Sequence, residues 1–83
     1  MIVKILGSGC MNCTTLEKRT REALTQLDIP ATVEKVQDIQ RIIAYGILST
    51  PGLVIDEKVV VSGRVPTVDA LKELIVANQK QEA

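Results

Sequence analysis

The stretch Gly7-Ser8-Gly9-Cys10-Met11-Asn12-Cys13 holds both cysteines of this 83-residue chain and follows an apolar segment at its N-terminus. That segment, Met1 to Leu6, is rich in β-branched residues and ends at glycines, which is typical of a buried strand. From Met11 onward, apolar or small residues recur at helical spacing until Asp28-Ile29-Pro30, where the proline pushes the preceding residue out of the helical region. The sequence therefore predicts a strand, a turn and an amphipathic helix that begins at the cysteines.

Two shorter segments follow this helix. Residues 31–36 alternate weakly and predict a second strand, with Val33 and Val36 as its buried positions. Asp38 can cap a short helix that loosens at Gly46. Four isoleucines form one stripe along this helix, and we expect the stripe to pack in the core rather than to seat a partner helix: Ile39, Ile42, Ile43 and Ile47.

The rest of the chain starts at a break formed by Ser49-Thr50-Pro51-Gly52. Two apolar β-branched runs between residues 53 and 61, joined by Asp56-Glu57-Lys58, predict a hairpin. After a turn over residues 63–66, Thr67 is expected to cap a last helix, and the tail over 79–83 is expected to fray. The core face of that helix comprises Val68, Leu71, Leu74 and Ile75.

The predicted element order is therefore β-α-β-α-β-β-α. The right-handed crossover rule makes the first two strands parallel neighbours, and the hairpin adds an antiparallel pair. We expect one α/β domain over residues 1–83, with a mixed four-stranded sheet flanked by three helices. The cysteines then fall at the carboxyl end of the first strand, where open α/β sheets place their chemistry.

The composition excludes several classes of function. The chain has no histidine, phenylalanine or tryptophan, so Cys-His catalysis, imidazole metal sites and aromatic stacking platforms are ruled out. Ten Lys and Arg balance ten Asp and Glu, so neither nucleic acid nor an anionic membrane is an expected partner. The first apolar run is too short for a signal peptide or a membrane span. We therefore expect a cytoplasmic protein, and we expect it to be a monomer.

The spacing of the two cysteines points to reactive sulfur. A disulfide across Cys-x-x-Cys closes too small a loop to stabilise the fold much, so the pair is either a reactive dithiol or half of a metal site. Backbone N–H groups and the dipole at a helix start favour a thiolate. Stabilising the Cys10 thiolate by roughly 1–2 kcal/mol would bring the pKa of Cys10 from ~8.5 to ~7. Cys13, one turn later on the same face, can resolve the mixed disulfide. We interpret Cys10 as the nucleophile and Cys13 as the resolving thiol.

Three segments carry a resemblance to a known family: residues 7–13, Ser49-Thr50-Pro51-Gly52, and Val61-Ser62-Gly63-Arg64. With them the chain resembles the thioredoxin and glutaredoxin superfamily, above all its small single-domain thioredoxin-like branch described as "redox-active disulfide protein 2". The likeness implies a thiol–disulfide oxidoreductase acting on protein or small-molecule disulfides, with no cofactor beyond the Cys10–Cys13 disulfide. It also implies disulfide-containing protein substrates and a reductant of the thioredoxin-reductase or glutathione type.

The same resemblance implies a cis Thr50-Pro51 bond that faces the dithiol, with the Thr50 backbone pairing to an extended substrate. The sequence alone shows a proline that opens a strand, which is more often trans. Met11 and Asn12, between the cysteines, complete the expected substrate-binding set together with Gly63. Ser62-Gly63 looks like a remnant of the glycine pair that contacts glutathione in glutaredoxins, although a simple turn is the better interpretation.

The chain also departs from the family pattern. Met11-Asn12 stands where thioredoxins have Gly-Pro and glutaredoxins Pro-Tyr, and no tryptophan precedes the dithiol. The first strand carries Lys4 and no carboxylate, so it does not supply the buried aspartate with which thioredoxins move protons. Lys4 either assists the thiolate or reaches solvent from an edge strand, and we favour the second.

A soft-metal-binding module or metallochaperone is the alternative function. Heavy-metal-associated domains also place Cys-x-x-Cys at a strand-to-helix turn, but in the order β-α-β-β-α-β and with a methionine where this chain has Ser8. Two thiolates leave zinc short of its usual four ligands, so this reading requires Cu(I) or a dimer. We expect no metal site.

Overall fold

The computed structural model describes residues 1–7, 11–47 and 49–79. Its elements follow the predicted order: β1 (Ile2–Leu6), α1 (Met11–Leu27), β2 (Thr32–Val36), α2 (Ile39–Ala44), β3 (Gly52–Ile55), β4 (Lys58–Ser62) and α3 (Val68–Gln79). Gln79, the first residue of the tail that was expected to fray, is still helical. Residues 80–83 lie outside the described part of the chain.

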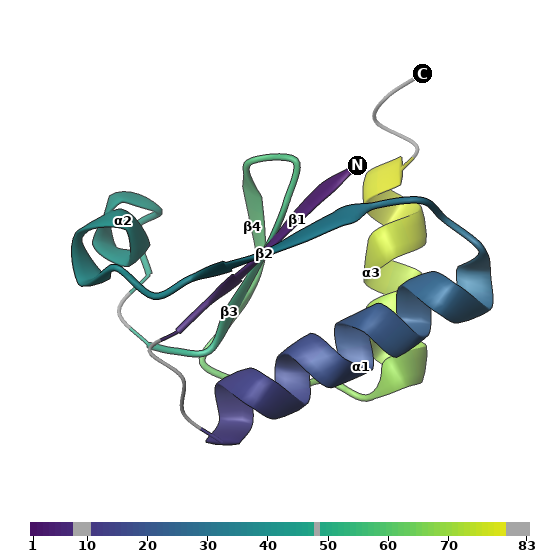
Figure 1. The fold of residues 1–83 in the computed structure, drawn as a ribbon, viewed down its shortest axis with the longest axis horizontal. Helices are drawn as coiled ribbons and strands as arrows, with labels where there is room; N and C mark the ends of the chain where they lie inside the picture. The colour runs from purple at the N-terminus through teal and green to yellow at the C-terminus, as the bar shows by residue number, and fades with distance from the viewer. Residues whose placement is uncertain (8–10, 48, 80–83) are drawn as a thin grey trace.

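The four strands form one mixed sheet in the order β2-β1-β3-β4 (Figure 1). β1 runs parallel to β2 and antiparallel to β3, and β3 and β4 form the predicted hairpin. Asp56 and Glu57 make its two-residue turn with φ of 47° and 68°, the left-handed geometry that suits the twist of a hairpin. The α/β class and the four-stranded mixed sheet are confirmed.

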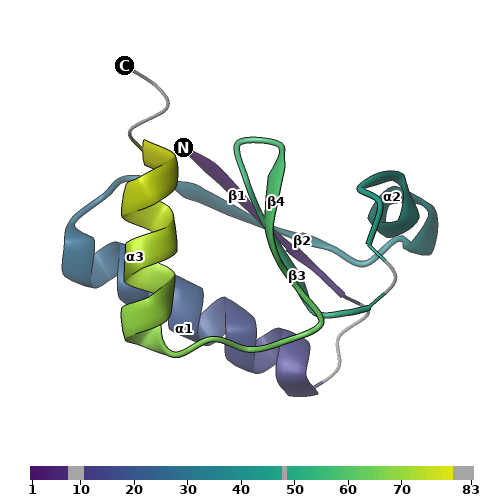
Figure 2. The same cartoon turned by 180° about the vertical axis from the view of Figure 1, so that it is seen from behind.

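The helices cover the sheet unequally. α1 and α3 pack on one face, and α2 packs on the other (Figures 1 and 2). Because successive residues of a strand point to opposite faces, β1 contributes to both cores. The larger core, under α1 and α3, includes Val3, Ile5, Leu16, Ala23, Leu24, Leu53, Ile55, Leu71 and Ile75, and the smaller one comprises Leu6, Val36, Ile42, Ile47 and Val54.

Two helix caps follow the sequence prediction. The Asp38 carboxylate accepts a hydrogen bond from the N–H of Gln40 at 2.9 Å, and the Thr67 hydroxyl accepts one from the N–H of Ala70 at 3.2 Å. Each cap satisfies an N–H group that has no partner inside its helix. These side chains therefore fix where α2 and α3 begin.

The prediction that the whole isoleucine stripe packs in the core is wrong. Ile42 and Ile47 are buried, but Ile39 and Ile43 are 62% and 60% exposed. The reason is that α2 has only six residues, so it offers the sheet little more than one turn. A helix this short can bury one isoleucine while its neighbours on the stripe remain in solvent.

The expectation that Lys4 lies on an edge strand is also wrong, because β1 is an interior strand of the sheet. The Lys4 side chain is 13% exposed, and its ammonium group donates hydrogen bonds to the Tyr45 hydroxyl at 2.9 Å and to a Glu57 carboxylate oxygen at 2.5 Å. The hydrogen bond to Glu57 raises the pKa of Lys4, with Tyr45 adding to the effect. The same bond from Lys4 lowers the pKa of Glu57.

No helix within the described ranges is both long and apolar enough to span a membrane.

Candidate functional site

The predicted resolving thiol, Cys13, lies in the first turn of α1 and is buried, with 5% of its surface exposed. Its sulfur is disulfide-bonded. Gly7, at the end of β1, is tied down by a hydrogen bond from its N–H to the Val36 carbonyl at 3.0 Å. A Cβ at Gly7 would overlap the Cys13 sulfur and lie 3.0 Å from the Cys13 Cβ. A glycine is therefore required where the strand passes this sulfur.

The Thr50-Pro51 peptide bond is cis, as the resemblance implies. Pro51 is buried, Thr50 is exposed, and the next residue, Gly52, pairs with Leu6 at the carboxyl end of β1. This pairing places the Thr50-Pro51 segment and Gly7 at the same end of the sheet. Cys13, which packs against Gly7, and the proline segment, distant in sequence, are thus brought to the same end of the sheet.

Gly63 belongs to this end of the sheet as well. Its N–H donates to the Pro51 carbonyl at 2.8 Å, and its φ of 77° lies in the left-handed region that favours glycine. The Ser62 hydroxyl donates to the Ser49 carbonyl at 3.4 Å. These two bonds hold the end of β4 and the residue after it against the proline segment, so Gly63 lies beside Pro51 in space.

The residues between the two cysteines face solvent. Met11 is 84% exposed and Asn12 is also exposed, so both are accessible to a partner molecule. Cys10 itself lies outside the described residues, and its role as nucleophile stays a prediction.

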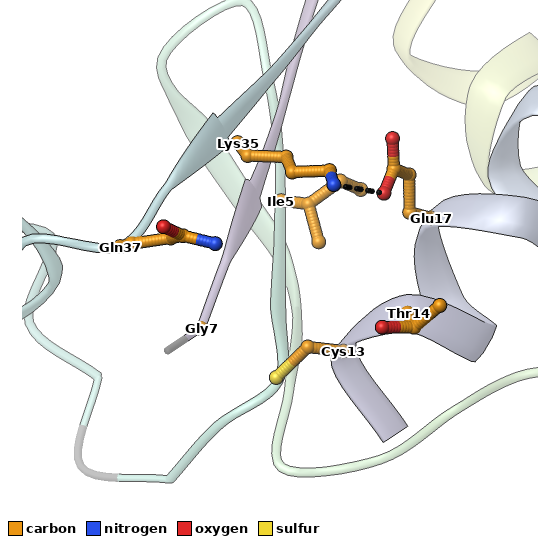
Figure 3. Close-up of a pocket in the computed structure, with 7 residues that line it drawn as sticks. All are labelled: Ile5, Gly7, Cys13, Thr14, Glu17, Lys35 and Gln37. Atoms are coloured by element: carbon orange, nitrogen blue, oxygen red, sulfur yellow. Dashed lines mark ion pairs between the residues drawn. The ribbon is translucent and has the colours of Figure 1, made fainter. Parts of the chain in front are cut away.

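Sequence analysis missed an ion pair beside Cys13. The Glu17 carboxylate, only 15% exposed, lies 3.3 Å from the Lys35 ammonium group and 3.1 Å from the Arg21 guanidinium group. Figure 3 shows Glu17 and Lys35 on the walls of a small cavity that Cys13 also lines. The spacing of four residues between Cys13 and Glu17 signals a shared helix face. Nothing comparable points to Lys35, because its place depends on how β2 pairs with β1.

Two observations on the described residues bear on the metal-binding alternative. Among the described residues, His, Cys, Asp and Glu side chains nowhere gather in a group of three or more that could hold a metal ion. The element order also differs from that of heavy-metal-associated domains, because a helix follows β2.

Comparisons with known proteins agree with this geometry. The family model for the thioredoxin domain matches residues 1–76. A thioredoxin from Methanothermobacter thermautotrophicus is 37% identical over 75 residues, which cover 90% of this chain and 97% of that protein. A thioredoxin from Methanocaldococcus jannaschii is 33% identical over 73 residues, covering 88% of this chain and 84% of that protein. The chain therefore belongs to the thioredoxin-domain family.

Proposed function

We propose that this protein is a thiol–disulfide oxidoreductase that exchanges disulfides with protein or small-molecule substrates through Cys10 and Cys13. The observation that carries the proposal is the packing of the Cys13 sulfur against Gly7, at the sheet end where Thr50-Pro51 is cis. Family membership supports the same chemistry. The redox-active disulfide is the whole cofactor in this proposal.

The exchange proceeds in two steps. The Cys10 thiolate attacks one sulfur of the substrate disulfide, the substrate S–S bond breaks, and one substrate thiolate leaves. Cys13 then loses its proton and attacks the Cys10 sulfur, which forms the Cys10–Cys13 disulfide and releases the second substrate thiolate. Two electrons pass from the dithiol to the substrate, and the two thiolates take protons from water. A reductant of the thioredoxin-reductase or glutathione type then restores the dithiol.

The start of α1 supports the choice of Cys10 as nucleophile. The helix begins at Met11, directly after Cys10, and its first turn contains no acidic residue. The free N–H groups of that turn favour a thiolate at the preceding residue. We therefore expect the pKa of Cys10 to be near ~7 rather than the ~8.5 of a free cysteine. A measured value above about 8.5 would contradict this argument.

The exposed residues around the sulfurs form the proposed contact surface for substrate. Met11 and Asn12 project to solvent between the cysteines, and Thr50 is exposed next to the buried Pro51. An extended substrate segment can pair with the Thr50 backbone, as a strand adds to a sheet edge. Gly63, held to Pro51 by its N–H, borders the same surface. The expected location of this activity is the cytoplasm.

Trapping experiments test the order of attack. The Cys13→Ser protein should accumulate mixed disulfides on Cys10, because no thiol remains to resolve them. The Cys10→Ser protein and the double variant should trap none. Mixed disulfides are counted by non-reducing electrophoresis and mass spectrometry of the intact adduct. Equal trapping by both single variants would overturn the assignment of roles.

Turnover is tested separately from binding. The wild-type protein should accelerate the reduction of insulin by dithiothreitol, and the double cysteine variant should not. A wild-type protein that binds disulfide-containing proteins yet shows no acceleration would be a binding module rather than an enzyme. Metal analysis after anaerobic purification covers the remaining alternative, because stoichiometric Cu(I) or Zn²⁺ would favour a metal carrier.

A further inference from the structure

A cavity of about 20 Å³ lies between the start of α1, the end of β1 and the edge strand β2. Cys13 and Gly7 line it, and so do the charged residues Glu17 and Lys35. In Figure 3 the two charged side chains point toward each other one helical turn beyond Cys13. A space of this size holds about one water molecule. The sulfur and the two charged side chains therefore border the same narrow space.

Glu17 and Lys35 are the charged residues among those that line this cavity. Glu17 is the more shielded of the two, since its side chain is 15% exposed and that of Lys35 is 58% exposed. Arg21, which is 56% exposed, pairs with the other oxygen of the Glu17 carboxylate. Because both charged residues line the same small cavity as the sulfur, salt in solution screens their effect on it only in part.

The two charges act on the sulfur with opposite sign. The Glu17 carboxylate opposes a negative charge on Cys13, and the Lys35 ammonium group favours one. The 3.3 Å pair keeps these effects close to balance, with the helix supplying one partner and the edge strand the other. A change in either partner leaves the remaining charge facing the cavity uncompensated.

We propose that the Glu17–Lys35 ion pair controls how readily Cys13 gives up its thiol proton to water, and hence how fast Cys13 resolves a mixed disulfide. This inference rests on the proposed function, because it concerns the second step of that exchange. Neither residue bonds covalently to a substrate. Both act through Cys13.

The test uses the Cys10→Ser background, in which Cys13 is the sole cysteine and its thiolate absorbance near 240 nm titrates alone. Glu17→Gln should raise the thiolate fraction below the midpoint of the titration by roughly three- to tenfold, as expected for one partly screened unit charge. Lys35→Gln should lower that fraction by a similar factor, and the double variant should return it close to the starting value. Glu22→Gln, an exposed carboxylate on the same helix, is the matched control and should change nothing.

The opposite signs separate this role from a structural one. If both single variants shift the titration in the same direction, or neither shifts it, the proposal is wrong. Lys35 is largely exposed, so Lys35→Gln is expected to fold even if Glu17→Gln does not. Lys35→Glu then gives a second reading, because a reversed charge should lower the thiolate fraction further than Lys35→Gln does.

A kinetic measurement in the protein with both cysteines links the titration to exchange. After a single-turnover mixing with a disulfide substrate, Lys35→Gln should slow resolution at neutral pH, and the deficit should close above the titration midpoint of Cys13. Formation of the mixed disulfide on Cys10 should be unchanged. A wild-type protein that forms no mixed disulfide refutes the proposed function and this inference together. Normal formation with no effect of Lys35→Gln on resolution refutes the inference alone.

Discussion

Replacing Gly7 with alanine tests how closely the end of β1 must approach Cys13. The added methyl group would overlap the Cys13 sulfur and lie 3.0 Å from its Cβ, and the hydrogen bond from the Gly7 N–H to Val36 prevents the strand from moving aside freely. Overpacking of this kind costs about 1–3 kcal/mol. The entropy of unfolding is about 2.1 cal/mol/K per residue, or about 0.17 kcal/mol/K for an 83-residue domain. Tm should therefore fall by about 6–17 °C.

The assay is thermal unfolding followed by circular dichroism, together with the rate of insulin reduction. Gly7→Ala should lower both the Tm and the rate of insulin reduction, because the sulfur must rotate away from its place at the strand end. Gly46→Ala is the matched control: it is strained by a φ of 81°, but its methyl group meets no atom within 4 Å. That variant should lose about 1 kcal/mol of stability and keep its reduction rate. A Gly7→Ala protein with wild-type Tm and rate would refute the packing argument.

Other variants test the remaining features. Glu57→Gln should destabilise the protein at pH 7 but not near pH 2, because the lowered pKa of Glu57 gives stability that is lost as pH falls through its folded value. The urea midpoint of unfolding at each pH measures this loss. An equal loss of stability at both pH values would count against the ion pair with Lys4. Thr67→Ala should lower the free energy of unfolding in urea by about 1 kcal/mol, because the cap of α3 is lost. An unchanged urea midpoint would show that this cap does not stabilise α3. Ile42→Ala should lower the free energy of unfolding by about 2–4 kcal/mol and Ile39→Ala by less than about 0.5 kcal/mol, because Ile42 is buried and Ile39 is exposed. Similar losses for the two variants would contradict this difference in burial.

Local patterns were sufficient to predict the order of the helices and strands. The periodicity of α1 runs for 17 residues and ends before Pro30, so its existence follows from the sequence alone. Asp38 and Thr67 mark their helix starts for the same local reason. The cis bond before Pro51 was different, because a proline at a strand start does not determine its isomer and only family resemblance implied it.

What sequence reasoning missed depends on contacts between distant segments. The sequence pattern does not show that β1 is an interior strand, because that position depends on pairings more than 45 residues apart, such as Val3 with Ile55. The edge position expected for Lys4 was wrong for this reason. Ile39 belongs to an apolar stripe, yet the short length of α2 decides which isoleucines are covered. Lys35 meets Glu17 for a similar reason, since β2 must first pair with β1.

Lys4 has a consequence for how the sheet assembles. If β1 slipped by one residue against its neighbours, every side chain of the strand would change faces. Lys4 would then enter the larger core beneath α1 and α3, away from Tyr45 and Glu57, and an ammonium group without partners is costly to bury. Val3 would at the same time leave that core. The polar residue in the middle of the sheet thus selects one alignment of the central strand and penalises the mispaired ones.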